Sequence, residues 1–106
     1  MPKYMFEASY GSEAAKGLQK AGAASRVKVV SEMCAGLGGS LDSFHFAFGD
    51  VDAFVICELP DDEAAAAVSF AVSSGGTVGI KTVKLMTVEQ VDAALKRSVK
   101  YKPPGS

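Results

Sequence analysis

The sequence of 106 residues has no tryptophan, one histidine and only two cysteines, at positions 34 and 57. The cysteines form no C-x-x-C pair, and with a single histidine they supply no cluster of the four ligands that a zinc site usually needs. We therefore expect no metal site and no cofactor. Both cysteines are predicted to be free thiols that behave as small apolar residues in a reducing cytoplasm.

An excess of charge of one sign is also lacking, and so is a long apolar run. Eleven basic and twelve acidic side chains leave a net charge of −1, so the basic excess typical of nucleic-acid-binding proteins is missing. No apolar run approaches the ~20 residues that span a bilayer, and the opening residues do not resemble a signal peptide. These absences predict one cytoplasmic domain over residues 1–106, with neither nucleic acid nor membrane as a partner.

The apolar patterns that are present alternate between strand and helix. Period-two alternation predicts strands over residues 3–10, 40–48, 52–58 and 77–86. Helical spacing predicts a short helix after Ser12, and then helices over 25–37, 61–74 and 87–99. The order β-α-α-β-β-α-β-α contains the split pattern of ferredoxin-like folds. We expect an α+β domain with an antiparallel sheet, helices on one face and an additional C-terminal helix.

Several polar residues predict where the helices begin and end. Ser12 and Asp61 are expected to be N-caps, and Thr87 with Gln90 fits a capping box. The pair Gly38-Gly39 is expected to end the helix over 25–37. The inner stripe of the last helix is predicted to consist of Val91, Ala94, Leu95 and Val99, followed by a proline-containing tail over 99–106.

The hairpin over residues 44–60 predicts how the sheet is covered. Phe44, Phe46 and Phe48 alternate on one strand face and are expected to fill the core, which places His45 on the opposite face or at a strand edge. The strand over 52–58 is apolar on both faces, which is typical of a strand covered on both sides. Since the helices cover only one face, we expect a second copy to cover the other, giving a homodimer or a higher homo-oligomer.

The sequence resembles a known family in several places. Gly49-Asp50-Val51-Asp52 is similar to a Gly-x-Tyr-Asp turn that gives one family its name, with valine here where the tyrosine would stand. The resemblance to the GYD domain family rests on that turn and on residues 1–4, 8–10, 37–39, 46–49, 58–62 and 98–105. It implies a ferredoxin-like domain similar to dimeric α/β-barrel proteins, and it brings no established reaction.

Five residues are candidates for a functional site. Histidine is the side chain best suited to acid-base chemistry near neutral pH, so His45 is an acid-base or ligand-binding candidate, or else an interface residue without a catalytic role. Asp50 and Asp52 could hold a cation or act as acid and base, or simply shape the turn. Tyr10 and Arg26 could line a pocket between sheet and helices.

Three functions remain open at this point. The first is an oligomeric small-molecule-binding or assembly domain without catalysis. The alternative is a cofactor-independent enzyme, similar to monooxygenases of the α/β-barrel architecture, that acts on a small apolar substrate with His45 or Tyr10 handling a proton. A second alternative is haem or metal binding through His45.

Overall fold

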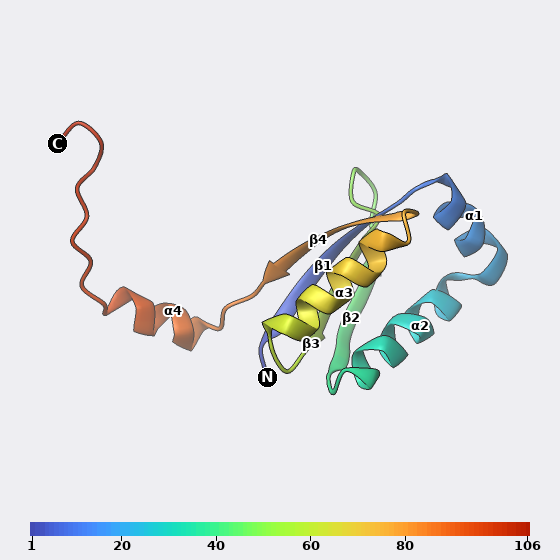
Figure 1. The fold of residues 1–106 in the computed structure, drawn as a ribbon, viewed down its shortest axis with the longest axis horizontal. Coiled ribbons are helices and arrows are strands. Elements are labelled where there is room, and N and C mark those ends of the chain that lie inside the picture. Colours follow the sequence, from blue (N-terminus) through green and yellow to red (C-terminus); the bar gives the residue numbers. More distant parts are fainter.

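A computed structural model describes residues 1–106 as an α+β domain (Figure 1). The four strands, β1 (Lys3–Tyr10), β2 (Ser40–Phe46), β3 (Ala53–Glu58) and β4 (Val78–Lys84), form one antiparallel sheet in the order β2-β3-β1-β4. The four helices are α1 (Ser12–Ala21), α2 (Ala23–Gly36), α3 (Asp62–Ser74) and α4 (Val88–Leu95). None of these helices is long and apolar enough to cross a membrane.

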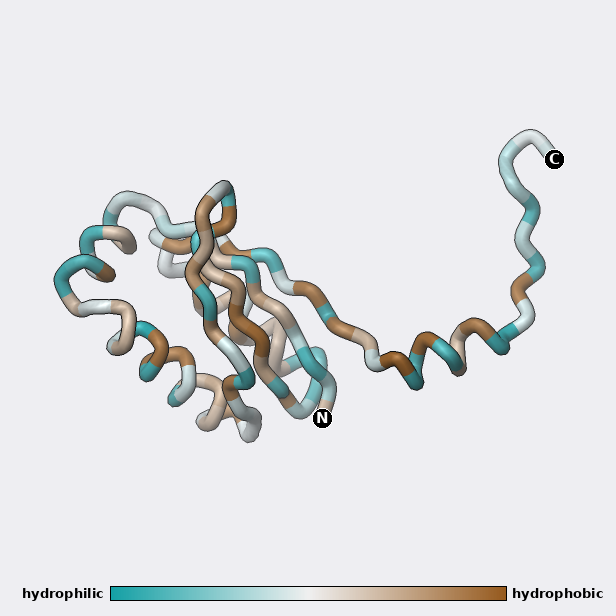
Figure 2. Tube along the Cα trace, turned by 180° about the vertical axis from the view of Figure 1, so that it is seen from behind, coloured by the Kyte–Doolittle hydropathy of each residue, from teal (hydrophilic) through white to brown (hydrophobic).

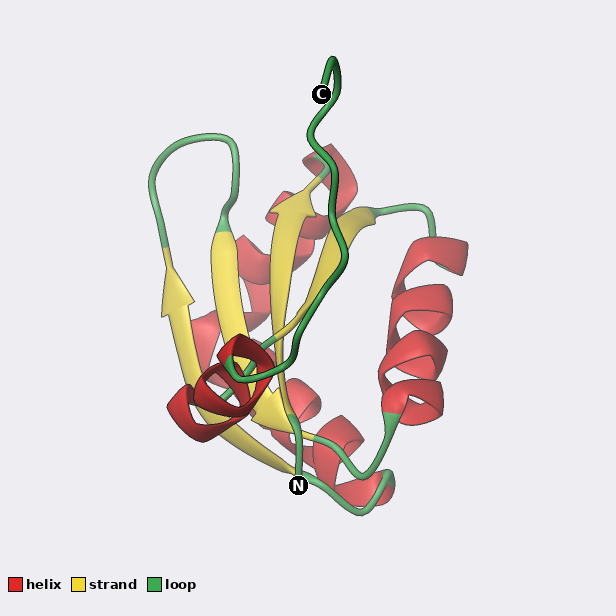
Figure 3. Cartoon of the chain, turned by 90° about the vertical axis from the view of Figure 1, so that its left-hand side faces the viewer, coloured by secondary structure: helices red, strands yellow, loops and turns green.

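Helices α2 and α3 lie against one face of the sheet, and α1 sits at its end (Figures 1 and 3). Seen from behind, the other sheet face carries no helix (Figure 2). The core fills the space between the two layers, where alternate strand residues meet the apolar stripes of the helices. Its buried members are Tyr4, Phe6, Val30, Cys34, Val55, Cys57, Leu59, Ala65 and Val68.

The hairpin of β2 and β3 differs from the simple alternation that the sequence predicts. A bulge between Leu41 and Ser43 changes the register, and Leu41 therefore packs on the core beside Phe44 instead of facing away from it. The strand ends at Phe46, and Phe48 is fully exposed in the loop that follows. The prediction that three phenylalanines fill the core is thus right for Phe44 and wrong for Phe46 and Phe48, which are exposed because the strand ends earlier than period-two counting expects.

The residues predicted to cap or terminate the helices are confirmed at three places and wrong at one. The Asp61 side chain accepts a hydrogen bond from the backbone N–H of Ala64, and Thr87 with Gln90 forms the capping box. Gly38 follows α2 with φ of 82°, the left-handed conformation that glycine adopts at low cost. Ser12 is not a cap, since α1 begins after Gly11 and has no side-chain cap hydrogen bond.

Helix α4 does not pack on the sheet. The sequence predicts an inner stripe of Val91, Leu95 and Val99, but these side chains are exposed by 42%, 77% and 79%. The helix also ends at Leu95, four residues before the predicted end. The expected spacing is present on the helix, yet the chain carries α4 away from the body, so its apolar residues stay exposed (Figure 1).

The two cysteines are free and buried, as predicted, and the fold brings them together although 23 positions separate them. Burial raises the pKa of the Cys57 thiol to about 12, with the nearby Cys34 sulfur adding to the effect. Burial also raises the pKa of Cys34. Both groups are therefore held as thiols at neutral pH, and the protected, unreactive form predominates.

We accordingly expect very slow labelling of both cysteines in the native protein. A pKa moved from 9.0 to about 12 lowers the thiolate fraction of Cys57 about a thousandfold at neutral pH, and burial blocks the reagent as well. When the protein is mixed with a chromogenic disulfide reagent at pH 7.5, absorbance should show almost no rapid release of the reagent's coloured thiolate before unfolding. In 6 M guanidinium chloride it should show two equivalents of released thiolate per chain. Rapid release of two equivalents from the folded protein would contradict the buried placement.

Candidate functional site

A cleft lies between α1, α2 and the adjoining ends of β1 and β4. Its volume is about 300 Å³, at the lower end of the range for small-molecule sites. Small residues on α1, among them Ala14 and Gly17, leave the space open, and Leu18 and Val29 supply apolar walls. The rest of the lining is Tyr10, Ala21, Gly22, Ser25, Arg26, Thr77 and Val78.

A narrow crevice of about 30 Å³ continues from this cleft into the layer between helices and sheet. Tyr10, Arg26 and Val78 line both spaces, so they mark the passage from one to the other. Apart from Arg26, every residue that lines the crevice is hydrophobic, including Phe6, Val30 and Val72. The cleft thus has a cationic group at its inner end and an almost wholly apolar environment behind it.

Arg26 is the polar group of this site that lacks a partner. Its Nε atom is buried and has no hydrogen-bond acceptor, and it is the one buried side-chain nitrogen or oxygen in this state. The two ion pairs of the structure, Lys3 with Asp42 and Lys84 with Asp62, do not involve it. A buried donor without an acceptor costs about 1–3 kcal/mol, so an acceptor placed here would bind favourably.

Tyr10 lies at the centre of the hollow region. Its backbone N–H donates to Oδ2 of Asp52 at 2.7 Å, which ties the end of β1 to the loop before β3. Its ring lies 6.4 Å from that of Phe46, measured between centroids. Tyr10 lines both the cleft and the crevice, and it shares both with Arg26.

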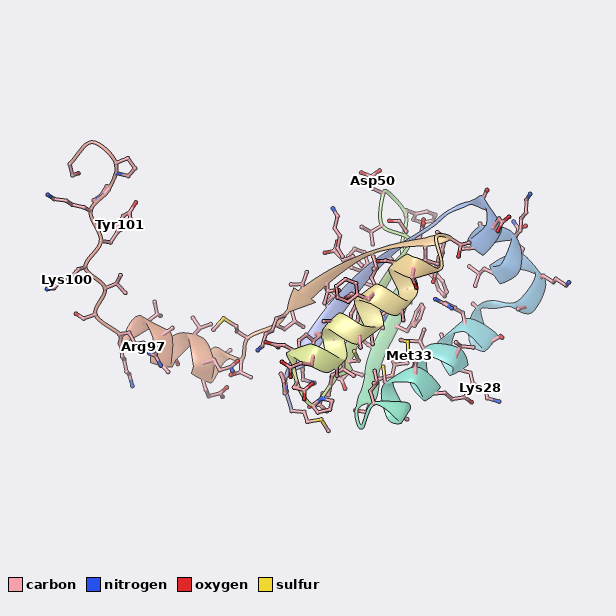
Figure 4. All side chains as sticks on the ribbon, in the orientation of Figure 1. Lys28, Met33, Asp50, Arg97, Lys100 and Tyr101 are labelled. Atoms are coloured by element: carbon pink, nitrogen blue, oxygen red, sulfur yellow. The ribbon has the colours of Figure 1, made fainter.

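The two aspartates of the turn play different parts. The Asp52 carboxylate is held by Tyr10, and its backbone N–H donates to the Ala8 carbonyl at 2.9 Å, so this residue fixes the loop. Asp50 lies at the tip of the β2–β3 loop and points away from the body (Figure 4). Only its carbonyl is engaged, by the Ser9 hydroxyl. Neither Asp50 nor Asp52 lines the cleft with Arg26, although Asp52 borders a separate hollow of about 280 Å³ together with Tyr10.

His45 lies on the opposite face of the sheet from the cleft. It pairs with Phe54 across β2 and β3, and this row belongs to the uncovered face. Its side chain is exposed. The structure contains no group of three or more histidine, cysteine, aspartate or glutamate side chains that could hold a metal ion.

A second polar cluster lies at the other end of β1. The Tyr4 hydroxyl donates to Oδ1 of Asp62 at 2.5 Å, and this hydrogen bond raises the pKa of Tyr4 to about 12. The hydrogen bond from the Tyr4 hydroxyl lowers the pKa of Asp62 from its usual value. Lys84, whose Nζ lies 3.0 Å from Oδ1 of Asp62, lowers it further. These contacts join β1, α3 and β4.

The sequence missed most of the cleft wall. Leu18 and Val29 were not among the candidates, because leucine and valine on a helix normally indicate core. The available signal was the break at Gly22 between α1 and α2, whose φ of 90° turns the two helices so that a space opens between them. The angle between two helices is a tertiary property and could not be read from the pattern.

The fold and the cleft define a small α+β domain with an open sheet face and a partly apolar cleft beside the helices. The model of the GYD domain family matches residues 4–95 of the 106-residue chain, and the protein belongs to this family. Neither curated proteins nor solved structures yield a match.

Proposed function

We propose that this protein is a homo-oligomeric domain that binds a small apolar molecule carrying a carboxylate in the cleft, without catalysing a reaction. The observation that carries the proposal is the unpartnered Nε of Arg26 at the inner end of an apolar hollow. The Nε–H and one terminal N–H of a guanidinium form a fork that matches the two oxygens of a carboxylate. The apolar walls and crevice suit the rest of the ligand.

We also infer the fold type, the assembly and the location of the protein. The strand order β2-β3-β1-β4, with helices on one face, supports a ferredoxin-like fold. The bare face carries Met5, Phe54 and Ile56, which supports a second copy lying against this face in a dimeric α/β-barrel type of assembly. Two buried free thiols support a cytoplasmic location.

The test compares a carboxylate probe with a neutral one. Isothermal titration of 3-phenylpropanoate and of its amide should give tighter binding of the acid to the wild-type protein. Arg26→Met keeps an apolar stem and removes the charge. This substitution should weaken binding of the acid at least about tenfold and leave binding of the amide nearly unchanged.

Two matched variants make this result specific. Lys28→Met removes a cation from the same helix, but Lys28 points away from the body (Figure 4), so acid binding should not change. His45→Ala alters the opposite sheet face and should also bind normally. Equal binding of acid and amide by the wild-type protein, or loss of binding in His45→Ala, would count against the Arg26 site.

An enzymatic function remains the alternative, supported by the Tyr10 side chain at the wall of the cleft. In this case Tyr10 would handle a proton of a small apolar substrate, as in a cofactor-independent enzyme. Tyr10→Phe should then remove turnover and preserve ligand binding. Haem or metal binding through His45, the third hypothesis, gains no neighbouring ligands from the structure.

A further inference from the structure

Residues 86–101, here called the C-terminal arm, leave the body and expose a row of apolar side chains. Helix α4 makes no substantial packing contact with any other helix or strand, and the molecule is 56 Å long but only 34 and 24 Å across (Figure 1). Arg97, Lys100 and Tyr101 lie far from the sheet (Figure 4). The exposed apolar residues of the arm are Met86, Val88, Val91, Leu95, Val99 and Tyr101.

Helix α4 has the features of a helix that packs against something. Val88, Val91 and Leu95 follow the i, i+3, i+7 spacing of one face, and the capping box fixes the start of the helix. An isolated helix shorter than about 12–15 residues is only marginally stable in water, so eight residues need packing to hold them. The family match also extends to residue 95, which makes α4 part of the domain and not an appended tail.

The uncovered sheet face carries a matching apolar surface. Met5 aligns with Ile56 on one side and with Val83 on the other, and Phe54 lies one step further along β3 on the same face. These four residues, here called the sheet patch, are only partly buried. The patch and the arm are continuous, because β4 carries Val83 and then leads through Met86 into α4.

The charges of the two parts are complementary. Residues 1–85 contain seven basic and ten acidic side chains, whereas residues 86–106 contain four basic and two acidic ones. Three of the four basic residues of the C-terminal segment, Lys96, Arg97 and Lys100, follow α4 directly within the arm. The opposite net charges of the two segments, −3 and +2, favour contact between the C-terminal segment of one copy and the body of another.

We propose that the C-terminal arm docks on a second copy of this chain, with the stripe of α4 lying against the partner's sheet patch. Two copies can exchange arms reciprocally about a twofold axis, which buries both arms and both patches and closes the assembly. This inference rests on the oligomeric part of the proposed function, and it adds that the arm, and not the sheet faces alone, holds the two copies together.

The test introduces the same charge on the two sides of α4. Sedimentation equilibrium of the wild-type protein at 10 μM should give twice the 11.0 kDa mass of one chain. Leu95→Asp should weaken the dimer at least about tenfold, because its carboxylate would be buried against the patch without a partner. The matched control Ala93→Asp lies on the opposite side of the helix and should remain dimeric. Val83→Lys, which alters the patch, should weaken the dimer like Leu95→Asp.

Each outcome decides between the arm and other arrangements. Far-UV circular dichroism should be native-like for Leu95→Asp, since Leu95 is exposed within its own chain. A wild-type dimer that persists in Leu95→Asp overturns the arm proposal and leaves an assembly through the sheet faces standing. If the wild-type protein is a monomer, whether its arm stays extended or folds back on its own sheet, both the arm proposal and assembly through the sheet faces are overturned. Binding of 3-phenylpropanoate by Leu95→Asp should be unchanged, which separates assembly from the cleft.

Discussion

Gly39→Ala is expected to lower the free energy of unfolding by about 3 kcal/mol or more, because the added methyl group has no room. A Cβ built at Gly39 would lie 2.0 Å from the Glu58 carbonyl oxygen and 3.0 Å from Cδ2 of Leu59. The close neighbour is backbone, so a side-chain rotation cannot relieve the overlap. The junction of α2 and β2 would have to move away from the end of β3.

Urea unfolding at a fixed protein concentration measures this loss. The matched control is Gly36→Ala in the last turn of α2, where a new Cβ meets nothing within 4 Å. Alanine is the better helix former, so this variant should gain about 0.5–1 kcal/mol. If Gly39→Ala unfolded at the wild-type urea concentration, the close packing of β2 on the end of β3 would be refuted.

Leu59→Ala should also destabilise the protein, by about 2–5 kcal/mol, because it opens a cavity in the core. Leu59 is 0% exposed and belongs to the main core cluster at the point where β3 leads into α3. Its backbone N–H also donates to the Pro2 carbonyl at 3.2 Å, so the neighbouring chain is restrained and cannot readily collapse into the space. Thermal unfolding followed by circular dichroism should show a clearly lower midpoint.

Phe70→Ala provides the comparison for this core substitution. Phe70 lies on α3 and is 74% exposed. The substitution therefore deletes a larger side chain that faces water and is not part of the core. Its effect on the free energy of unfolding should stay within about 0.5 kcal/mol. A loss for Phe70→Ala as large as that for Leu59→Ala would mean that Phe70 is covered, for example by another copy.

The local patterns predicted the element order well, because they depend on neighbouring residues. Alternation placed β1 at its observed bounds, and the capping residues Asp61 and Thr87 began their helices where expected. The core assignment of Phe44 and the opposite placement of His45 also followed from alternation. Alternation did not predict the bulge after Leu41. One inserted residue reverses which sheet face the side chains occupy, and no residue type in the sequence indicates the insertion.

The candidate site was predictable only in part. Tyr10 and Arg26 were expected to line a pocket, and the structure places them in the same cleft. His45 and Asp50 were grouped with them because they are rare or acidic residues of one hairpin. The structure separates them: His45 is on the far face of the sheet, and Asp50 is at a loop tip. Which face of the sheet receives the helices determines this separation, and that choice depends on contacts distant in sequence.

By itself, the sequence determined the α+β class, the strands and helices, and membership of a family that its turn and flanking motifs resemble. Those features depend on local geometry: side-chain periodicity, caps and turn residues. Only the tertiary structure decided that Arg26 is left without a partner beside an apolar cleft, that the two cysteines meet, and that α4 stands away from its own sheet. Each of these depends on the packing of distant segments, which no local pattern specifies.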